Sequence, residues 1–587
     1  MWLPAVHGAS PVPFDSAQEP MVMTLHAICG QPRTVRSAVL SALLCIGLSQ
    51  DALAQDTDPV EQLSNPTSMG TQRFGSSFWF GLVGSPDGGG APQQVVGAGS
   101  PWASVTPAGS STALSKAGCV TLFRQLSFGW LPMRGNAGVN LVAPSPLANG
   151  NFGFAISMSG SFLVVGAPGM GVPLNSGRAY LYEWAAGESC VPGDTSEWCL
   201  RAELSNAALP GTADPPAAVD LFGSSVANLG SIVAVAAPNN DVRYPSVQFP
   251  GQTVNVVDCG SVTMFAPRTD PKTGRVVWVP FAFISPPVLN ASGQPDSSID
   301  PSALSSSFFG ASIAMNGSTL IVGSKRTTVT QAAQGAVYVY DFDPLALTVT
   351  YRQRLNAPSS LAQANEQLGS SVSSEGGRIV AGAPNRSGGT GLANMGAAYA
   401  FEREPAGSGP FVFRAQFRAS DGQGGDFFGT SVAVRGNRMV VGAPGKDFAS
   451  DIDRGSAYLF AQEDVECNTW TQALRVSPSL GSGAQFGAHV GLSFNELFAV
   501  GAPGATSPLG PGQGVVLLYE RDLVGCPQDL NGDGTTDGLD LALCLSAWGP
   551  ASGAGYYADF NGDSVVDGFD LTGLLAKWGP CSCAPEP

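Results

Sequence analysis

A short motif recurs along most of this chain of 587 residues. It consists of a Phe-Gly or Leu-Gly pair, an alternating stretch, a tight turn and an apolar run that usually ends in Gly-Ala-Pro. The least interrupted copies lie 58–60 residues apart, and a period of this size is typical of solenoids, propellers and arrays. Six copies are well formed and a degenerate one precedes them, so that the seven begin at Phe74, Phe152, Phe222, Phe309, Leu368, Phe428 and Phe486.

Each copy predicts four short β-strands. The first strand alternates, as in Gly-Thr-Ser-Val-Ala-Val after Phe428, and the second is the apolar run. The third has the form Gly-Ser-Ala-Tyr-Leu-Phe, and the fourth precedes the next Phe-Gly pair. Alternation bounded by Gly, Pro and Asn indicates strands, and four-stranded units repeated about an axis form a propeller. We therefore predict a mainly β fold built on a seven-bladed β-propeller of four-stranded blades.

The repeat resembles the FG-GAP family, known from the seven-bladed propellers of integrin α-subunits. The last copy stops at its third strand, whereas residues 60–63 (Val-Glu-Gln-Leu) match the fourth strands of the other copies. We predict that these N-terminal residues complete the seventh blade. Calcium-binding integrin blades have an Asp-rich loop between the first two strands, but here that connection is too short for a cation site. Arg435-Gly436-Asn437 lies in such a connection and is expected to be a turn rather than an adhesion signal.

Two near-copies of an acidic loop follow the repeats, 30 residues apart. Oxygen-bearing side chains stand at loop positions 1, 3, 5, 9 and 12, and an apolar helix is predicted after each loop. Ca²⁺ takes roughly six to eight oxygen ligands, which a 12-residue loop of this spacing can supply. The expected ligands are Asp529, Asn531, Asp533, Thr535 through its carbonyl, Asp537 and Asp540 in the first site, and Asp559, Asn561, Asp563, Val565 through its carbonyl, Asp567 and Asp570 in the second.

The sixth position distinguishes the two loops. The chain must turn sharply there, and a positive φ is easiest for glycine. Gly534 occupies this position in the first loop and Ser564 in the second. We therefore expect two calcium ions to bind, the second more weakly.

The loops lack a preceding amphipathic helix, so this region resembles dockerin modules, which are paired loop–helix repeats. The resemblance implies calcium-dependent docking to a cohesin-like partner protein, through the loop positions held here by Gly538, Leu539, Gly568 and Phe569. A purely structural calcium staple is the alternative, and burial of Leu539 and Phe569 would favour it. The predicted organisation is an N-terminal extension and signal peptide at 1–54, the propeller at 55–524 and a small α-helical dockerin-like domain at 525–587.

Composition agrees with an exported protein that does not bind nucleic acid. The net charge is −17, and residues 526–587 contain nine acidic residues and one basic residue, whereas phosphates require a basic surface. Arg33 and Arg36 precede an apolar run at 38–48 that is too short to span a membrane, and a small-residue cleavage site ends at Ala54. We expect cleavage after Ala54, no membrane span in the mature chain, and a secreted or cell-surface protein.

Export permits disulfide bonds. Cys190 and Cys199 bracket a short insertion and form the best local pair, while Cys526 could join Cys581 or Cys583. Nine cysteines remain after removal of the signal peptide, so at least one stays free or pairs between chains. No partner is evident for Cys119, Cys259, Cys467 and Cys544.

Catalysis has little support in the sequence. Hydrolytic triads and zinc sites generally use histidine, but the mature chain has only His489, at a point where several other copies have Ser. A glycosidase needs only two carboxylates, and nothing marks any two of the acidic residues near strand ends as partners. Those residues are Glu375, Glu496, Asp220 and Asp426; Asp447, Asp451 and Asp453 stand in a longer loop and are expected to be solvated.

Three functions therefore remain. The preferred one is a secreted, calcium-binding, non-catalytic interaction protein, whose propeller binds a protein or glycan and whose dockerin-like tail docks to a partner. The second is a glycoside hydrolase or other hydrolase on a propeller scaffold, which a carboxylate pair converging in a cleft would favour. The third is a calcium staple or sorting tail on a binding propeller. The longer insertions at 99–117, 239–258 and 286–308, with Trp102, Tyr244 and Phe249, are the candidate ligand surface.

Overall fold

The computed structural model describes most of the repeat region and part of the C-terminal module. The described residues are 59–67, 71–83, 93–107, 109–126, 129–171, 175–184, 190, 196–206, 219–404, 409–449, 451–464, 469–493, 497–520, 528, 535–550, 558, 565–576 and 578–580. The predicted signal peptide and its cleavage site lie outside these ranges, as do Cys467, Cys526, Cys581 and Cys583.

Seven antiparallel sheets of four main strands form the blades of a β-propeller, as the repeat predicted. Blade one contains β2 (Ser77–Val83), β3 (Gln93–Ser100), β4 (Cys119–Leu126) and β5 (Gly129–Pro132), with β6 (Asn140–Leu141) also paired to β4. Blade two contains β7 (Ala155–Ser159), β8 (Phe162–Ala167), β9 (Arg178–Trp184) and β10 (Trp198–Leu204). Blade three contains β11 (Ser225–Leu229), β12 (Ile232–Ala237), β15 (Ser261–Thr269) and β16 (Val276–Ile284).

The remaining four blades repeat this order. Blade four contains β17 (Phe309–Asn316), β18 (Thr319–Ser324), β19 (Ala336–Asp343) and β20 (Thr348–Leu355), and blade five β21 (Ser371–Glu375), β22 (Arg378–Ala383), β23 (Ala397–Arg403) and β24 (Phe411–Phe417). Blade six contains β25 (Ser431–Arg435), β26 (Arg438–Ala443), β27 (Ser456–Asp464) and β28 (Thr469–Val476). Blade seven contains β29 (His489–Leu492), β30 (Leu497–Ala502), β31 (Val515–Glu520) and β1 (Glu61–Leu63).

The first strands of successive blades contact one another in sequence, and β29 of the last blade contacts β2 of the first, so the ring is closed. The core lies between neighbouring blades: Ile321 of blade four, for example, packs in one buried cluster with Ile379 of blade five.

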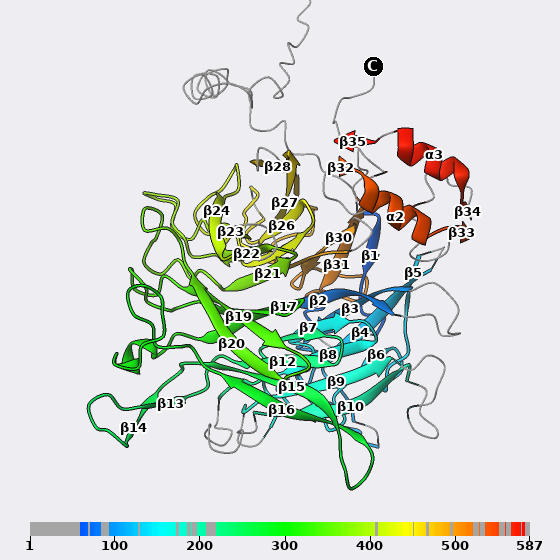
Figure 1. Ribbon diagram of the computed structural model, residues 1–587. Coiled ribbons are helices and arrows are strands. Elements are labelled where there is room, and N and C mark those ends of the chain that lie inside the picture. The colour runs from blue at the N-terminus through cyan, green and yellow to red at the C-terminus, as the bar shows by residue number, and fades with distance from the viewer. Residues whose placement is uncertain are drawn as a thin grey trace, which may run out of the picture. The chain divides into compact units, whose positions relative to one another are not determined.

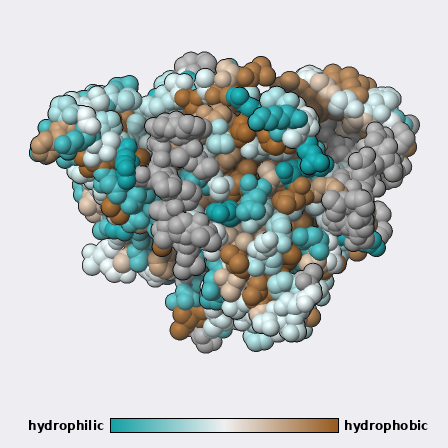
Figure 2. All heavy atoms as spheres, turned by 90° about the horizontal axis from the view of Figure 1, so that it is seen from below, coloured by the Kyte–Doolittle hydropathy of each residue, from teal (hydrophilic) through white to brown (hydrophobic). Residues whose placement is uncertain are grey.

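Hydrophilic and hydrophobic residues are interspersed on the face shown in Figure 2. The turn at Arg435-Gly436-Asn437 joins β25 to β26 as expected, with a φ of 53° at Gly436.

The Phe-Gly pair of each repeat joins its blade to the preceding one. The Phe428 N–H donates to the Met395 carbonyl over 3.1 Å, and Gly396, at the start of the preceding blade's third strand, forms a bridge with Phe428. A Cβ on Gly396 would lie 2.0 Å from the Phe428 carbonyl oxygen, so only glycine fits there. The equivalent N–H of the motif donates in the same way at all seven junctions. We call this contact the blade latch.

The N-terminal strand closes the seventh blade, as predicted. β1 pairs antiparallel with β31, with Leu63 opposite Val516, and the Val60 N–H donates to the Leu518 carbonyl over 2.9 Å. Figure 1 shows β1 beside β31, which lies more than 400 residues later in the chain. Leu63 is only 3% exposed and packs in a cluster shared by blades one and seven. The two chain ends of the propeller are therefore held by a three-residue strand.

Leu63→Ala tests this closure. Deleting a buried leucine side chain typically costs about 2–5 kcal/mol of unfolding free energy. We expect a loss in this range in urea unfolding, and almost none for Val60→Ala, because the Val60 side chain, directly before the strand, is exposed. Equal effects of the two substitutions would show that β1 does not close the ring.

His489 lies at the junction between blade seven and blade one. In four other blades the equivalent serine donates to the carbonyl of the next blade's motif glycine, as Ser431 does to Gly487 over 2.8 Å. His489 Nε2 instead lies 3.0 Å from the Phe78 carbonyl, and its ring meets the Phe78 ring edge to face. Burial lowers the pKa of His489 to about 4. The imidazole is thus neutral at neutral pH and acts as part of the packing.

The stability of the ring should therefore depend on pH below neutrality. Because the folded-state pKa is below the unfolded value of about 6.5, neutral His489 contributes stability above pH 6.5 that is lost as the pH falls towards 4. We expect His489→Ser to remove about 2–3 kcal/mol of the difference in unfolding free energy between pH 6.5 and pH 4.5. Urea unfolding of both proteins at the two pH values measures this, and the same pH dependence in both would contradict it.

Candidate functional site

The two acidic loops each lead into a short helix. α2 (Gly538–Ser546) and α3 (Gly568–Ala576) are the predicted helices, and they begin at the tenth position of their loops rather than after the loops. Asp537 caps α2 by accepting the Leu539 N–H over 2.7 Å, and Asp540 Oδ2 accepts the Asp537 N–H over 2.8 Å, which forms a capping box. In the second repeat, Asp570 Oδ2 accepts the Asp567 N–H over 2.9 Å.

The two repeats are joined reciprocally. β32 (Thr535–Thr536), in the first loop, pairs with β35 (Gly579–Pro580) after the second helix, whereas β34 (Val565–Val566), in the second loop, pairs with β33 (Gly549–Pro550) after the first. The helices contact each other and run in opposite directions (Figure 1). Cys544, Ala558, Val566 and Leu574 form the buried core of the module.

The structure describes half of the expected calcium ligands. Asp529, Asn531, Asp533, Asp559, Asn561 and Asp563 lie outside the described residues, whereas the last three ligands of each loop are Thr535, Asp537 and Asp540, and Val565, Asp567 and Asp570. Asp540 and Asp570 are almost completely buried, although a carboxylate is rarely buried without a compensating partner. A set of carboxylate, amide and carbonyl oxygens suits Ca²⁺, so the chemistry of the donors fits this ion. When bound, Ca²⁺ would supply positive charge, and these buried carboxylates could coordinate the ion.

The residues expected to face a partner lie at the start of the helices. Gly538 and Leu539 open α2, and Leu539 is 62% exposed. Gly568 is exposed at the start of α3. Phe569 follows it, and the side chain of Phe569 lies outside the described part. Exposure of a large apolar residue at Leu539 favours a docking surface over a calcium staple.

Models of known families match both the repeat region and the C-terminal module of the chain. A model of the FG-GAP repeat matches residues 138–182 and 411–460, and a model of the dockerin type I domain matches residues 527–576. The chain carries FG-GAP repeats and a C-terminal dockerin type I domain. Dockerin type I domains generally bind calcium and imply a cohesin-type protein partner.

Comparison with single proteins adds less. No curated protein matches the chain. Saccharomyces cerevisiae Sqt1 matches with 10% identity and a TM-score of 0.35, covering 80% of this chain and all of Sqt1. A putative 6-phosphogluconolactonase from Bacteroides fragilis has 11% identity and a TM-score of 0.37, with 71% of this chain and 90% of that protein covered. Its counterpart from Bacteroides uniformis has 11% identity, a TM-score of 0.38 and coverages of 72% and 91%.

Two features bear on export. The predicted disulfide between Cys190 and Cys199 is present. Cys119, Cys259 and Cys544 are buried, and none of them forms a disulfide with another described cysteine. Within the described ranges, no helix has the length and apolar character needed to cross a membrane.

Two of the three insertions considered as a ligand surface, 239–258 and 286–308, contact each other. Insertion 239–258 contains a hairpin, β13 (Val242–Pro245) with β14 (Thr253–Val256), and β14 contacts the short helix η3 (Pro301–Leu304) of insertion 286–308. The Tyr244 hydroxyl, in this hairpin, donates to the Pro286 carbonyl over 2.8 Å. In insertion 99–117, the ring centroid of Trp102 lies 4.6 Å from Lys116 Nζ and 4.6 Å from Cζ of Arg73, which precedes the first Phe-Gly pair. Phe249 is exposed in the turn of the hairpin.

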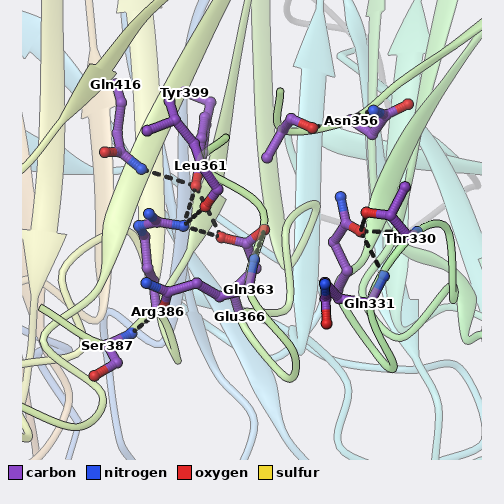
Figure 3. Close-up of polar contacts among 12 residues, drawn as sticks. Thr330, Gln331, Asn356, Leu361, Gln363, Glu366, Arg386, Ser387, Tyr399 and Gln416 are labelled. Atoms are coloured by element: carbon purple, nitrogen blue, oxygen red, sulfur yellow. Dashed lines mark hydrogen bonds and ion pairs between the residues drawn. The ribbon is translucent and has the colours of Figure 1, made fainter. Parts of the chain in front are cut away.

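A buried ionic cluster in blade five was not predicted from the sequence. Arg386 Nη1 lies 2.6 Å from Glu366 Oε2, and the Tyr399 hydroxyl donates to the same oxygen over 2.8 Å. Gln416 donates to the Tyr399 hydroxyl over 2.8 Å (Figure 3). Glu366 and Arg386 are buried. The signal was present in the repeat: Glu366 stands two residues before Leu-Gly and Arg386 two residues after Gly-Ala-Pro, where blade six has Asp426 and Lys446.

Among the described acidic residues considered for catalysis, Asp426 and Glu375 pair with basic side chains. Asp426 lies 3.0 Å from Lys446 Nζ, and burial raises its pKa. Glu375 pairs with Arg435 over 3.4 Å. Asp220 is buried in blade three, whereas Asp426 belongs to blade six, so the two carboxylates do not share a blade. Glu496 lies outside the described residues. In the loop after Gly-Ala-Pro of blade six, Asp451 pairs with Arg454 over 3.3 Å and Asp447 accepts the Asp453 N–H over 2.8 Å.

The cluster in blade five should stabilise the fold as long as its two opposite charges, Glu366 and Arg386, remain paired. Glu366→Gly leaves Arg386 buried without its carboxylate, which typically costs about 3–5 kcal/mol. Blade two has Gly150, Met170 and Tyr180 at the equivalent positions, and a Cβ on Gly150 would lie 2.5 Å from the Met170 sulfur, so methionine fills this space.

The double variant Glu366→Gly/Arg386→Met copies the arrangement of blade two. We expect it to recover at least half of the unfolding free energy that Glu366→Gly loses, because it removes the unpaired buried charge. Urea unfolding at pH 7 compares the three proteins. A double variant less stable than the single one would show that the cluster does more than balance charge.

Proposed function

We propose that this is an exported, non-catalytic interaction protein that docks in a calcium-dependent manner to a cohesin-type partner. The observation that carries the proposal is the dockerin domain, with its buried loop carboxylates Asp540 and Asp570 and its exposed Leu539. The propeller is the second binding element and presents a protein-binding or glycan-binding surface. The intact Cys190–Cys199 disulfide agrees with a secreted or cell-surface location, where disulfides persist.

Calcium and docking are linked through the helix starts. The carboxylates expected to bind the ion at loop positions 9 and 12 also make the capping contacts of α2, as Asp537 and Asp540 do. The exposed Leu539 follows directly in the first turn of that helix. Ion binding would therefore fix the turn that presents the docking residue, and loss of the ion would leave clustered negative charge at the same place. We expect two calcium ions, with the site of Ser564 the weaker.

A non-catalytic role is supported by the surroundings of the propeller carboxylates. A glycosidase needs one carboxylate as acid and another as nucleophile or base, both on the same substrate. Asp426 is buried beside Lys446, and Glu366 is buried beside Arg386. A carboxylate that is buried and bound to a cation is poorly placed to donate a proton to a substrate.

The proposal predicts that capture of the partner requires calcium. The full chain is immobilised and exposed to the envelope and secreted fractions of its source cell, with Ca²⁺ or with EDTA. We expect one discrete protein in calcium and at least a tenfold loss in EDTA. Asp540→Asn/Asp570→Asn should cause a similar loss in calcium, because each substitution removes a charged ligand while an amide oxygen can still accept the capping hydrogen bond.

Leu345→Ala is the control, since Leu345 is 94% exposed on the propeller. It should capture as much partner as the natural chain. Calcium titration of each protein shows whether the ion sites are intact. If the captured amount is the same in EDTA, or if nothing is captured, the docking proposal is wrong.

A further inference from the structure

Two exposed tryptophans of the dockerin domain stand outside the positions considered so far. Trp548 and Trp578 occupy equivalent places, 30 residues apart, each followed by Gly-Pro. They are 51% and 50% exposed. Trp578 also lies beyond the residues that the dockerin model matches. Water contact on half of an indole is unfavourable, so two matched exposures in so small a module require an explanation.

The strand pairing places each tryptophan near the loop of the other repeat. Thr536 lies opposite Gly579, so the loop that contains Leu539 and the segment after α3 that carries Trp578 meet at one end of the module. Val566 lies opposite Gly549, which brings Trp548 to the loop that leads into Phe569. Each end therefore combines a loop from one repeat with a tryptophan from the other.

The backbone that carries the tryptophans is fixed. Gly549 and Gly579 have φ values of 117° and 120°, a conformation that favours glycine, and the next residue of each is paired in a strand. An indole has few rotatable bonds, so it loses little conformational entropy when it is buried by a partner. Tryptophan is accordingly frequent among the residues that dominate binding energy at protein interfaces.

We propose that Trp548 and Trp578 are anchor residues of the docking surface, each acting beside the apolar loop residue of the opposite repeat. This rests on the proposed function, and the occupant is the same cohesin-type protein. That partner should have an apolar pocket for an indole within a basic rim. The rim is inferred from charge, because residues 526–587 contain nine acidic residues and one basic residue, and two bound Ca²⁺ ions would offset only four of the eight net negative charges. The same charge disfavours a second copy of this module and an anionic membrane.

The proposal is tested with the full chain and the protein that it captures in calcium. Trp548→Ala, Trp578→Ala and the double variant are titrated with that purified protein, with Leu345→Ala and Leu539→Ala for comparison. We expect each single tryptophan variant to bind at least tenfold more weakly, and the double variant to lose binding. Calcium titration should be unchanged in all of them, since an exposed indole supplies no oxygen ligand. Trp548→Phe/Trp578→Phe should restore part of the affinity.

The outcomes separate this inference from the docking proposal. If Leu539→Ala weakens binding and the double tryptophan variant does not, the anchors are wrong while docking stands. If neither weakens binding, or no protein is captured, both are wrong. Two further measurements would overturn the choice of partner: self-association in sedimentation that the double variant abolishes, which indicates a second copy, or tryptophan-dependent binding to phosphatidylglycerol vesicles, which indicates lipid.

Discussion

The propeller depends on a close backbone approach that repeats at every blade junction. A glycine at the start of each third strand lies against the Phe-Gly or Leu-Gly pair of the next blade, with no space for a side chain between them. The motif glycine itself has a positive φ, such as 91° at Gly429. Both glycines are therefore required by geometry. Because the contact is between main chains, the surrounding side chains can vary from blade to blade.

Ring closure follows from the same arrangement with one difference. Six blades take their four main strands from one continuous stretch, but blade seven takes its outer strand from residues before the first blade. The ring therefore cannot be completed until both ends of the repeat region are present. The junction also differs in chemistry, since His489 replaces the serine that bridges several other blades. A short strand and a partly buried histidine thus make this junction distinct from the other six.

Much of the fold was predictable because its determinants are local in sequence. The period gave the number of blades, the alternation gave the strands, and the missing fourth strand of the last copy pointed to residues 60–63, which pair with β31. The presence of a helix in each of the two C-terminal repeats was predictable for the same reason. The pairing of Thr536 with Gly579 was not, because a two-residue strand has no period and its partner lies in the other repeat. The exposure of Trp548 could not be inferred either, since an apolar residue at a helix end is equally compatible with a core.

The two parts of the chain hold buried carboxylates by different means. In the propeller, Glu366 is matched by Arg386 and Asp426 by Lys446, so the charges are balanced within the chain itself. In the dockerin domain, residues 526–587 contain nine acidic residues and one lysine. Charge burial without compensation is costly, and a divalent ion is the compensation that oxygen ligands select. On the proposed function, calcium orders the docking end of the chain, whereas the ion pairs described in the propeller use the chain's own side chains. Calcium would then control attachment to the partner while leaving the scaffold intact.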